Sequence, residues 1–286
     1  MATPEYGVPS RDVHVRRIRF AYPSGSLRHH FVDGDLVMSH VVAVLSATFP
    51  PGEDFFVHSV RHFSDKVTDP ELAGQVRGFI GQEVTHGREH RELNRQLQEM
   101  GYPTHLVSRF VKGGLADAWK RAPKKMCLAY TAALEHYTAT IAEVLLTKPE
   151  AQALLGDTEV RNVLLWHALE ETEHKAVAFD VYRAAGGSER MRRWGFRIQT
   201  VLLLLTIFVF TLLSMLGDRA TYNPVRLGRS LWRLRRSPFM TRDVRRALGA
   251  YTRVGFHPDD VDNEALVARW RTELFGPEGT LADHVG

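Results

Sequence analysis

The sequence has a single cysteine, Cys127, among its 286 residues. One cysteine excludes an intramolecular disulfide and any cysteine-rich zinc or iron–sulfur site, and this usage is typical of a reducing compartment. Any metal ion would therefore have to be held by histidine, glutamate or aspartate. We expect the protein to act in the cytoplasm.

Strand patterns are scarce, and nucleotide-binding loops are missing. Runs of alternating strand-type residues are scarce, and helical periodicity predicts an all-α protein. No glycine-rich dinucleotide fingerprint follows a strand, and there is no flavin motif, so a redox reaction would need an external electron donor. Residues 1–30 contain no continuous apolar core, and we expect no secretory signal there.

Composition and helix boundary signals divide the chain into four segments. With 44% hydrophobic and 24% charged residues, the chain can bury a full core. We predict an N-terminal extension over 1–34, a four-helix bundle over 35–187, an apolar helix over 188–218 and a basic helical region over 219–286.

The helices of the bundle are predicted from proline, glycine and capping signals. We expect a first helix over 35–67 that is broken at Pro50-Pro51, because proline lacks a backbone donor. Asp69-Pro70 should start the second helix and Gly101 should end it. A linker containing Gly113-Gly114 should lead to a third helix over about 123–149. We expect Asp157 to cap a fourth helix ending at Gly186-Gly187, and Ser188 to cap a fifth.

A glutamate followed later by a Glu-x-x-His pair occurs twice in the chain. The first copy is Glu53 with Glu83 and His86, and the second is Glu135 with Glu171 and His174. Each copy places a lone glutamate on one helix and a pair on the next. This is the ligand pattern of a carboxylate-bridged di-iron or di-manganese site in a ferritin-like four-helix bundle.

The spacing explains how such a site could hold two ions. Residues three apart project from one stripe of a helix, so each Glu-x-x-His pair can chelate one metal ion. The lone glutamates can bridge or cap the ions. Four carboxylates nearly balance the charge of two iron(II) ions, and carboxylate with imidazole suits iron or manganese better than zinc. We predict two iron ions, with manganese or zinc as alternatives.

Two further histidines lie on the same helical stripes. His167 precedes Glu171 by one turn, and we count it as an additional ligand. His90 lies one turn beyond His86 and is predicted either to bind the metal or to hydrogen-bond to a ligand. Glu170 and Glu173 fall off the main stripe, and we expect them to be salt-bridging surface acids.

The ligand pattern resembles that of ferritin-like di-iron N-oxygenases acting on arylamines, which add a histidine four residues before the second Glu-x-x-His. His167 occupies that position here. At residue 82 this chain has glutamine where that family has aspartate. This resemblance implies an oxygenase with a di-iron centre.

A wider resemblance is to a bacterial family described as predicted metal-dependent hydrolases. It is carried by the sequence FPPGEDFF at 49–56, by Glu83-x-x-His86-x-x-x-His90 and by the sequence WHALEETEHK at 166–175. The similarity spans roughly residues 10–260, and it implies a metal-dependent enzyme.

An apolar run, VLLLLTIFVFTLLSML, occupies residues 201–216 between two arginine-rich stretches. The run is slightly short for a simple crossing of the bilayer, which takes about 20 residues. A crossing would also place one basic flank on the wrong side of the membrane. We therefore favour a monotopic or re-entrant membrane anchor. The alternatives are a fifth bundle helix in the core and a homodimer interface.

These features predict an enzyme in which two iron ions activate O2 to oxidise an apolar or amphipathic small molecule. The alternative is a metal-dependent hydrolase that uses water activated by two metals. The hydrolase prediction ranks lower because helical hydrolases of that type use His-Asp motifs, and the chain has no His-Asp dipeptide. A non-enzymatic iron-handling protein is a third reading. We expect no nucleic-acid partner, because no reading module accompanies the arginines.

Overall fold

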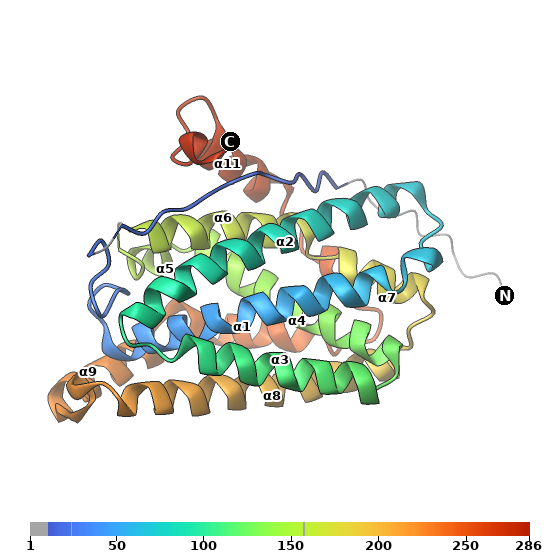
Figure 1. The fold of residues 1–286 in the computed structure, drawn as a ribbon. Coiled ribbons are helices and arrows are strands. Elements are labelled where there is room, and N and C mark those ends of the chain that lie inside the picture. The colour runs from blue at the N-terminus through green and yellow to red at the C-terminus, as the bar shows by residue number, and fades with distance from the viewer. Residues whose placement is uncertain (1–10, 24, 157) are drawn as a thin grey trace.

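A computed structural model of the chain describes residues 11–23, 25–156 and 158–286. Within these residues the chain is helical and has no β-strand; one isolated antiparallel bridge pairs Ile18 with Val285. The all-α prediction is confirmed. Figure 1 shows long helices lying side by side, with the two chain ends running over one face of the molecule.

Four helices form the centre of the molecule and carry the predicted ligands. They are α1 (Leu36–Arg61), α2 (Pro70–Glu99), α4 (Lys124–Thr147) and α6 (Glu159–His174). Helix α1 packs against α2 and α4, and α6 packs against α4 and α2. The two copies of the glutamate motif therefore occupy α1 with α2 and α4 with α6.

Further helices surround this group. They are α3 (Thr104–Arg121), α5 (Pro149–Ala153), α7 (Val177–Ala184), α8 (Glu189–Leu216), α9 (Pro224–Arg235), α10 (Arg242–Ala250) and α11 (Glu264–Phe275). Short 3-10 turns lie at Ser64–Lys66, Arg219–Tyr222, Pro238–Met240, Pro258–Asp260 and Ala282–His284. Helices α10 and α11 pack on α4 and α6, so the basic C-terminal region lies against the bundle.

Several predicted helix ends are confirmed. The carboxylate of Asp69 accepts from the backbone of Glu71 and Leu72 ahead of α2, and Gly101 follows that helix with φ +99°. The Ser188 hydroxyl caps α8 by accepting from the Met191 backbone. The predicted cap Asp157 lies outside the described residues, and Thr158 holds the N-cap position of α6.

The predicted break at Pro50-Pro51 is wrong, because α1 continues through both prolines. These prolines remove the backbone donors that would bond to the carbonyls of Ser46 and Ala47, four residues earlier. Side chains from neighbouring helices replace them. The Asn94 amide donates to the Ser46 carbonyl at 2.9 Å, and the Ser108 hydroxyl donates to the Ala47 carbonyl at 2.6 Å.

Two other boundaries also differ from the prediction. Gly113-Gly114 lies inside α3 and does not form a linker. Both glycines are exposed on that helix and nothing lies within 4 Å of a Cβ placed on either, so no packing contact depends on them. The predicted fourth helix is divided, because α6 ends at His174 and α7 begins at Val177.

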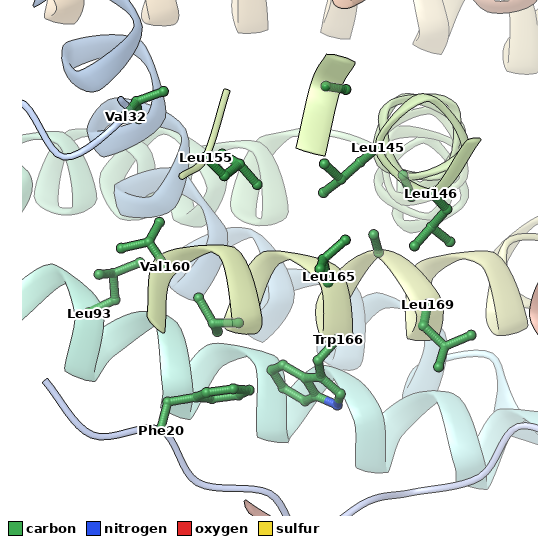
Figure 2. Packing of buried hydrophobic residues seen from close by; sticks show 14 of the residues in the cluster. Phe20, Val32, Leu93, Leu145, Leu146, Leu155, Val160, Leu165, Trp166 and Leu169 are labelled. Atoms are coloured by element: carbon green, nitrogen blue, oxygen red, sulfur yellow. The ribbon is translucent and has the colours of Figure 1, made fainter. Parts of the chain in front are cut away.

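A hydrophobic core joins segments that are far apart in the sequence. Figure 2 shows Trp166 of α6 beside Phe20 of the N-terminal segment, with their ring centroids 5.5 Å apart. The same cluster includes Leu93 of α2 and Trp270 of α11. Residues before α1 and after α10 therefore help to hold α6 in position.

Helix α8 lies along α1 and α4 at the edge of the molecule (Figure 1). It has 28 residues and a mean hydropathy of 2.3 over its most apolar window, and 22% of that window is buried. Among the described residues it is the one helix long and apolar enough to cross a membrane. By length and composition alone, this is a weak indication of membrane contact.

Candidate metal centre

Four buried glutamates, one from each central helix, meet inside the bundle. They are Glu53 of α1, Glu83 of α2, Glu135 of α4 and Glu171 of α6, each no more than 3% exposed. His86 of α2 and His167 and His174 of α6 join them and are also buried. The structure brings together these seven residues, whose spacing alone predicted a metal centre.

Donor atoms of six of these residues, all but Glu135, fall into two groups, each with its atoms within 4.8 Å of one another. One group is Glu53, His86 and His167, and the other is Glu83, Glu171 and His174. Glu171 and His174 share a group as expected, whereas Glu83 and His86 fall in different groups. The packing of the helices explains this difference. Glu83 and His86 lie on one stripe of α2, but each of them also faces donor atoms from other helices.

Glu83 and Glu171 lie between the two groups. One Glu83 oxygen is 3.7 Å from His86 Nδ1 and 3.2 Å from His174 Nε2. The Glu171 carboxylate is 2.8 Å from His167 Nε2 and 3.7 Å from His174 Nε2. These two carboxylates are therefore placed to bridge two ions.

Glu53 and Glu135 lie at opposite ends of the cluster. Glu53 is 4.0 Å from His167 Nε2, and Glu135 is 3.3 Å from His174 Nε2. Each lone glutamate contacts one group of donors, so it can cap one ion.

The polar atoms of the cluster fit bound cations. Both carboxylate oxygens of Glu53, Glu83 and Glu135 are buried and make no hydrogen bond. One oxygen of Glu171 and the inward ring nitrogens of His86 and His174 also have no hydrogen-bond partner. Buried charged groups without partners are very costly, and metal ions would compensate them. Hard carboxylate oxygens with imidazole nitrogens suit iron or manganese.

Ionisation of the cluster supports the same conclusion. Burial and the neighbouring charge of Glu83 raise the pKa of Glu53 well above its usual range. Burial, together with the charges of Glu171 and Glu83, raises the pKa of Glu135 to about 8. Without a cation, the cluster therefore favours the protonated form of both carboxyls. A metal ion would displace those protons.

His86 and His174 are each held from behind by a hydrogen bond. His86 Nε2 donates to the Glu170 carboxylate at 3.0 Å, which leaves Nδ1 facing the cluster. His174 Nδ1 donates to the amide oxygen of Gln82 at 2.8 Å, and the Gln82 amide donates to Glu173 at 2.8 Å. Such outer partners fix the tautomer and orientation of a metal-binding histidine.

His90 lies behind His167 and belongs to neither group of donors. Its Nε2 is 2.7 Å from His167 Nδ1, and its Nδ1 is 2.9 Å from the Ser46 hydroxyl. Of the two predicted roles for His90, this position corresponds to hydrogen bonding with a ligand. Burial lowers the pKa of His90 well below its usual value, which favours the neutral ring.

The expectation that Glu170 and Glu173 are surface acids is wrong. Both are buried, at 0% and 5% exposure. Arg16 donates to Glu170 at 2.9 Å and to the two oxygens of Glu173 at 2.9 and 2.7 Å. Arg271 of α11 adds a 2.7 Å bond to Glu173. The arginines provide the charge that a buried carboxylate requires.

Arg16 and Arg271 were missed by the sequence analysis. Arg16 belongs to the N-terminal segment that crosses α2 and α6 (Figure 1). Neither arginine lies on a helical stripe with a ligand, so spacing carries no signal for them. The one available signal was the pair of acids beside Glu171, which need cationic partners if α6 is buried on every side.

Aromatic rings surround the histidines. Trp166 lies 4.9 Å from His86, Phe79 lies 4.9 Å from His174, and Phe49 lies 4.9 Å from His167, measured between ring centroids. This apolar shell limits the access of water to the carboxylates. It also strengthens electrostatic interactions within the cluster.

Comparison with known proteins gives one family. The family described as "Predicted metal-dependent hydrolase" matches residues 14–262. The matched range contains all four ligand-bearing helices, Arg16 and α8. Searches of curated proteins and of solved structures found no match.

Proposed function

Because this chain belongs to the family of predicted metal-dependent hydrolases, we propose that it is a metal-dependent enzyme whose centre holds two metal ions. The observation that carries the proposal is the buried cluster of carboxylate and imidazole atoms that lack hydrogen-bond partners. The ligands would be Glu53, Glu83, His86, Glu135, His167, Glu171 and His174. His90 would orient His167 from behind.

The donor set favours iron and an oxidative reaction. Four glutamates and two histidines, contributed by four packed helices, match the ligand set of ferritin-like di-iron sites, and His167 adds a third histidine. Two iron ions would supply electron transfer to O2, with an organic molecule oxidised in the same site. The chain carries no dinucleotide or flavin motif, so the electrons would come from a separate donor protein or cofactor.

The residues of this chain would prepare the site for that chemistry. Glu83 and Glu171 can shift between the two groups of donors as charge changes, because each lies within 3.8 Å of histidines in both. Glu170, Gln82 and His90 hold the imidazole rings in position. The aromatic shell keeps water from competing with an apolar substrate.

Hydrolysis is the second candidate, and the family description favours it. In that reaction two bound metal ions would lower the pKa of a water molecule and stabilise the developing oxyanion. The substrate would be an ester or a phosphate ester.

Metal analysis and turnover with and without O2 separate the two reactions. We expect protein from iron-replete cells to contain about two iron ions per chain, visible as a coupled pair by Mössbauer spectroscopy. Adding O2 to the anaerobic ferrous protein should then produce a transient visible absorption. Zinc- or manganese-dependent ester cleavage without O2, and a ferrous protein inert to O2, would instead establish the hydrolase.

A further inference from the structure

Helix α8 is amphipathic in the reverse sense of a soluble surface helix. Over residues 201–216 its exposed residues are all apolar, and eight of them are at least 48% exposed: Val201, Leu202, Leu204, Leu205, Phe208, Leu212, Leu213 and Leu216. Its polar residues Gln199, Thr211 and Ser214 face the protein and are no more than 7% exposed. Soluble helices place these classes of residue the other way round.

Hydrogen bonds fix this orientation of α8. The Ser214 hydroxyl lies 2.7 Å from His40 Nδ1 of α1, and Thr200 accepts from the Tyr137 hydroxyl of α4 at 2.8 Å. Rotating the apolar face inward would break both contacts and bury leucines where polar partners now lie. The exposed apolar face is therefore a built feature of the fold.

Arginines and exposed aromatic rings lie at both ends of α8. At the N-terminal end, Arg197 lies over the ring of Trp194 at 5.5 Å, and Arg190 is exposed nearby. Beyond the C-terminal end, Arg236 lies over the ring of Trp232 at 4.3 Å. Both tryptophans are more than half exposed. Tryptophan and arginine together are typical of the interface between lipid tails and headgroups.

We propose that α8 lies in the plane of an anionic membrane surface, with its leucines in the lipid tails and its flanking arginines among the headgroups. A second copy of the chain fits this face less well, because either orientation of a dimer would bring arginine-rich ends together. A crossing helix also fits less well. Because α8 packs lengthwise on α1 and α4, a crossing would draw the charged bundle into the hydrocarbon.

A cavity lies beside α9, which follows the C-terminal end of α8 after one short turn. It has a volume of about 300 Å³ and is lined by Arg226, Arg229, Arg233 and Ser230. Asp35 offsets one of these cations, since Arg233 lies 3.7 Å from its carboxylate. The remaining positive charge suits the phosphate of a lipid headgroup.

Vesicle flotation of the full chain tests the proposal independently of the metal reaction. We expect the protein to float with phosphatidylglycerol–phosphatidylcholine vesicles and much less with phosphatidylcholine alone, and we expect added salt to reduce flotation. Phe208→Glu should reduce binding about tenfold or more, because it places a charge where an apolar ring enters lipid. The matched control is Val254→Glu, at a residue 77% exposed beyond α10, which should bind as the native chain does.

Thiol labelling tests the in-plane orientation. Cys127 is buried, so a cysteine introduced by Arg190→Cys or Tyr222→Cys would be the reactive one. A membrane-impermeant maleimide should label both variants on intact vesicles. Labelling of only one end would show a crossing helix and overturn the proposal.

Two other results would also overturn it. One is a native chain that fails to float with anionic vesicles under low salt. The other is a stable dimer in sedimentation that Phe208→Glu converts to monomers, with no vesicle binding by either form. Circular dichroism would confirm that each variant is folded.

Discussion

At the scale of residues, the centre consists of inner donors and outer partners that hold them. The inner donors could be predicted because helix geometry places residues three, four and seven apart on one stripe. The outer partner Arg16 could not, since it reaches Glu170 and Glu173 from a segment with no helical period. Pairing across 154 residues depends on tertiary packing, which spacing does not encode.

Replacing one bridging carboxylate tests the inner donors. Glu83→Gln keeps the size of the side chain but removes the charge between the two groups. We expect metal content to fall from about two ions per chain to one or none. The melting temperature of the metal-free protein should fall, because His174 and His86 outweigh burial and hold the pKa of Glu83 below its usual value, and the mutation removes these ion pairs.

Glu92→Gln is the matched control for that variant. Glu92 lies on the same helix, but its side chain is 41% exposed and paired with Arg95. It should retain the native metal content, measured by inductively coupled plasma mass spectrometry. Native metal content in Glu83→Gln would contradict its assignment as a ligand.

Removing Arg16 tests the outer partners. Arg16→Gln leaves the carboxylates of Glu170 and Glu173 buried with less positive charge beside them. Breaking such a buried ion pair costs about 3–5 kcal/mol. We expect a loss of unfolding free energy near the lower figure, because Arg271 still bonds to Glu173. Urea titration would measure it.

The neighbouring residue provides the control. Arg17 is exposed, and Arg17→Gln should change unfolding free energy by less than about 0.5 kcal/mol. Arg16→Gln should also weaken metal binding, because Glu170 and Glu173 then hold His86 and His174 less firmly. Equal stability and metal affinity in the two variants would show that Arg16 has no such role.

At the scale of elements, the helix ends were largely predictable, whereas the continuity of α1 was not. Asp69, Gly101 and Ser188 act locally, so sequence signals are sufficient at those positions. The prolines of α1 are tolerated only because Asn94 and Ser108 bond to the carbonyls they leave free. Those donors come from α2 and α3, and a local rule cannot detect them.

A double-mutant cycle tests this explanation of α1. Asn94→Ala should cost about 1–3 kcal/mol of unfolding free energy, because it leaves the Ser46 carbonyl buried without a donor. Pro50→Ala restores a backbone N–H that can bond to the same carbonyl. In the Pro50→Ala background, Asn94→Ala should therefore cost less by about 1 kcal/mol. Strict additivity in urea titrations would refute the explanation.

At the scale of the whole molecule, the ends of the chain meet over the bundle. The Arg19 backbone donates to the His284 carbonyl at 3.1 Å, beside the bridge between Ile18 and Val285. Through Arg16 and Arg271, both ends reach Glu173. Periodicity predicted an all-α chain but not this closure, because the terminal segments gain their positions only from contacts with the finished bundle.

The ionisation of the whole centre makes stability depend on pH when metal is absent. Burial opposes the charged form of His86, but Glu170 and Glu83 outweigh it and raise the pKa from 6.5 to about 10. Glu135 is raised from 4.5 to about 8. Between pH 6.5 and 8, both groups therefore hold protons in the folded chain that the unfolded chain releases.

Stability of the metal-free protein should consequently fall as pH rises from 6.5 to 8. The expected slope is about 1.4 kcal/mol per pH unit for each retained proton. The histidines with lowered pKa values act in the opposite sense, but this effect fades by about one pH unit above 6.5, where the unfolded chain has released the same protons. Urea titrations after chelation would measure the slope. Glu135→Gln removes one retained proton and should reduce the slope by about 1.4 kcal/mol per pH unit.

In the metal-loaded protein the cations replace these protons, so stability should hold or rise over the same range. A metal-free chain that became more stable between pH 6.5 and 8 would mean that the carboxyls are already ionised, and that their burial needs no cation.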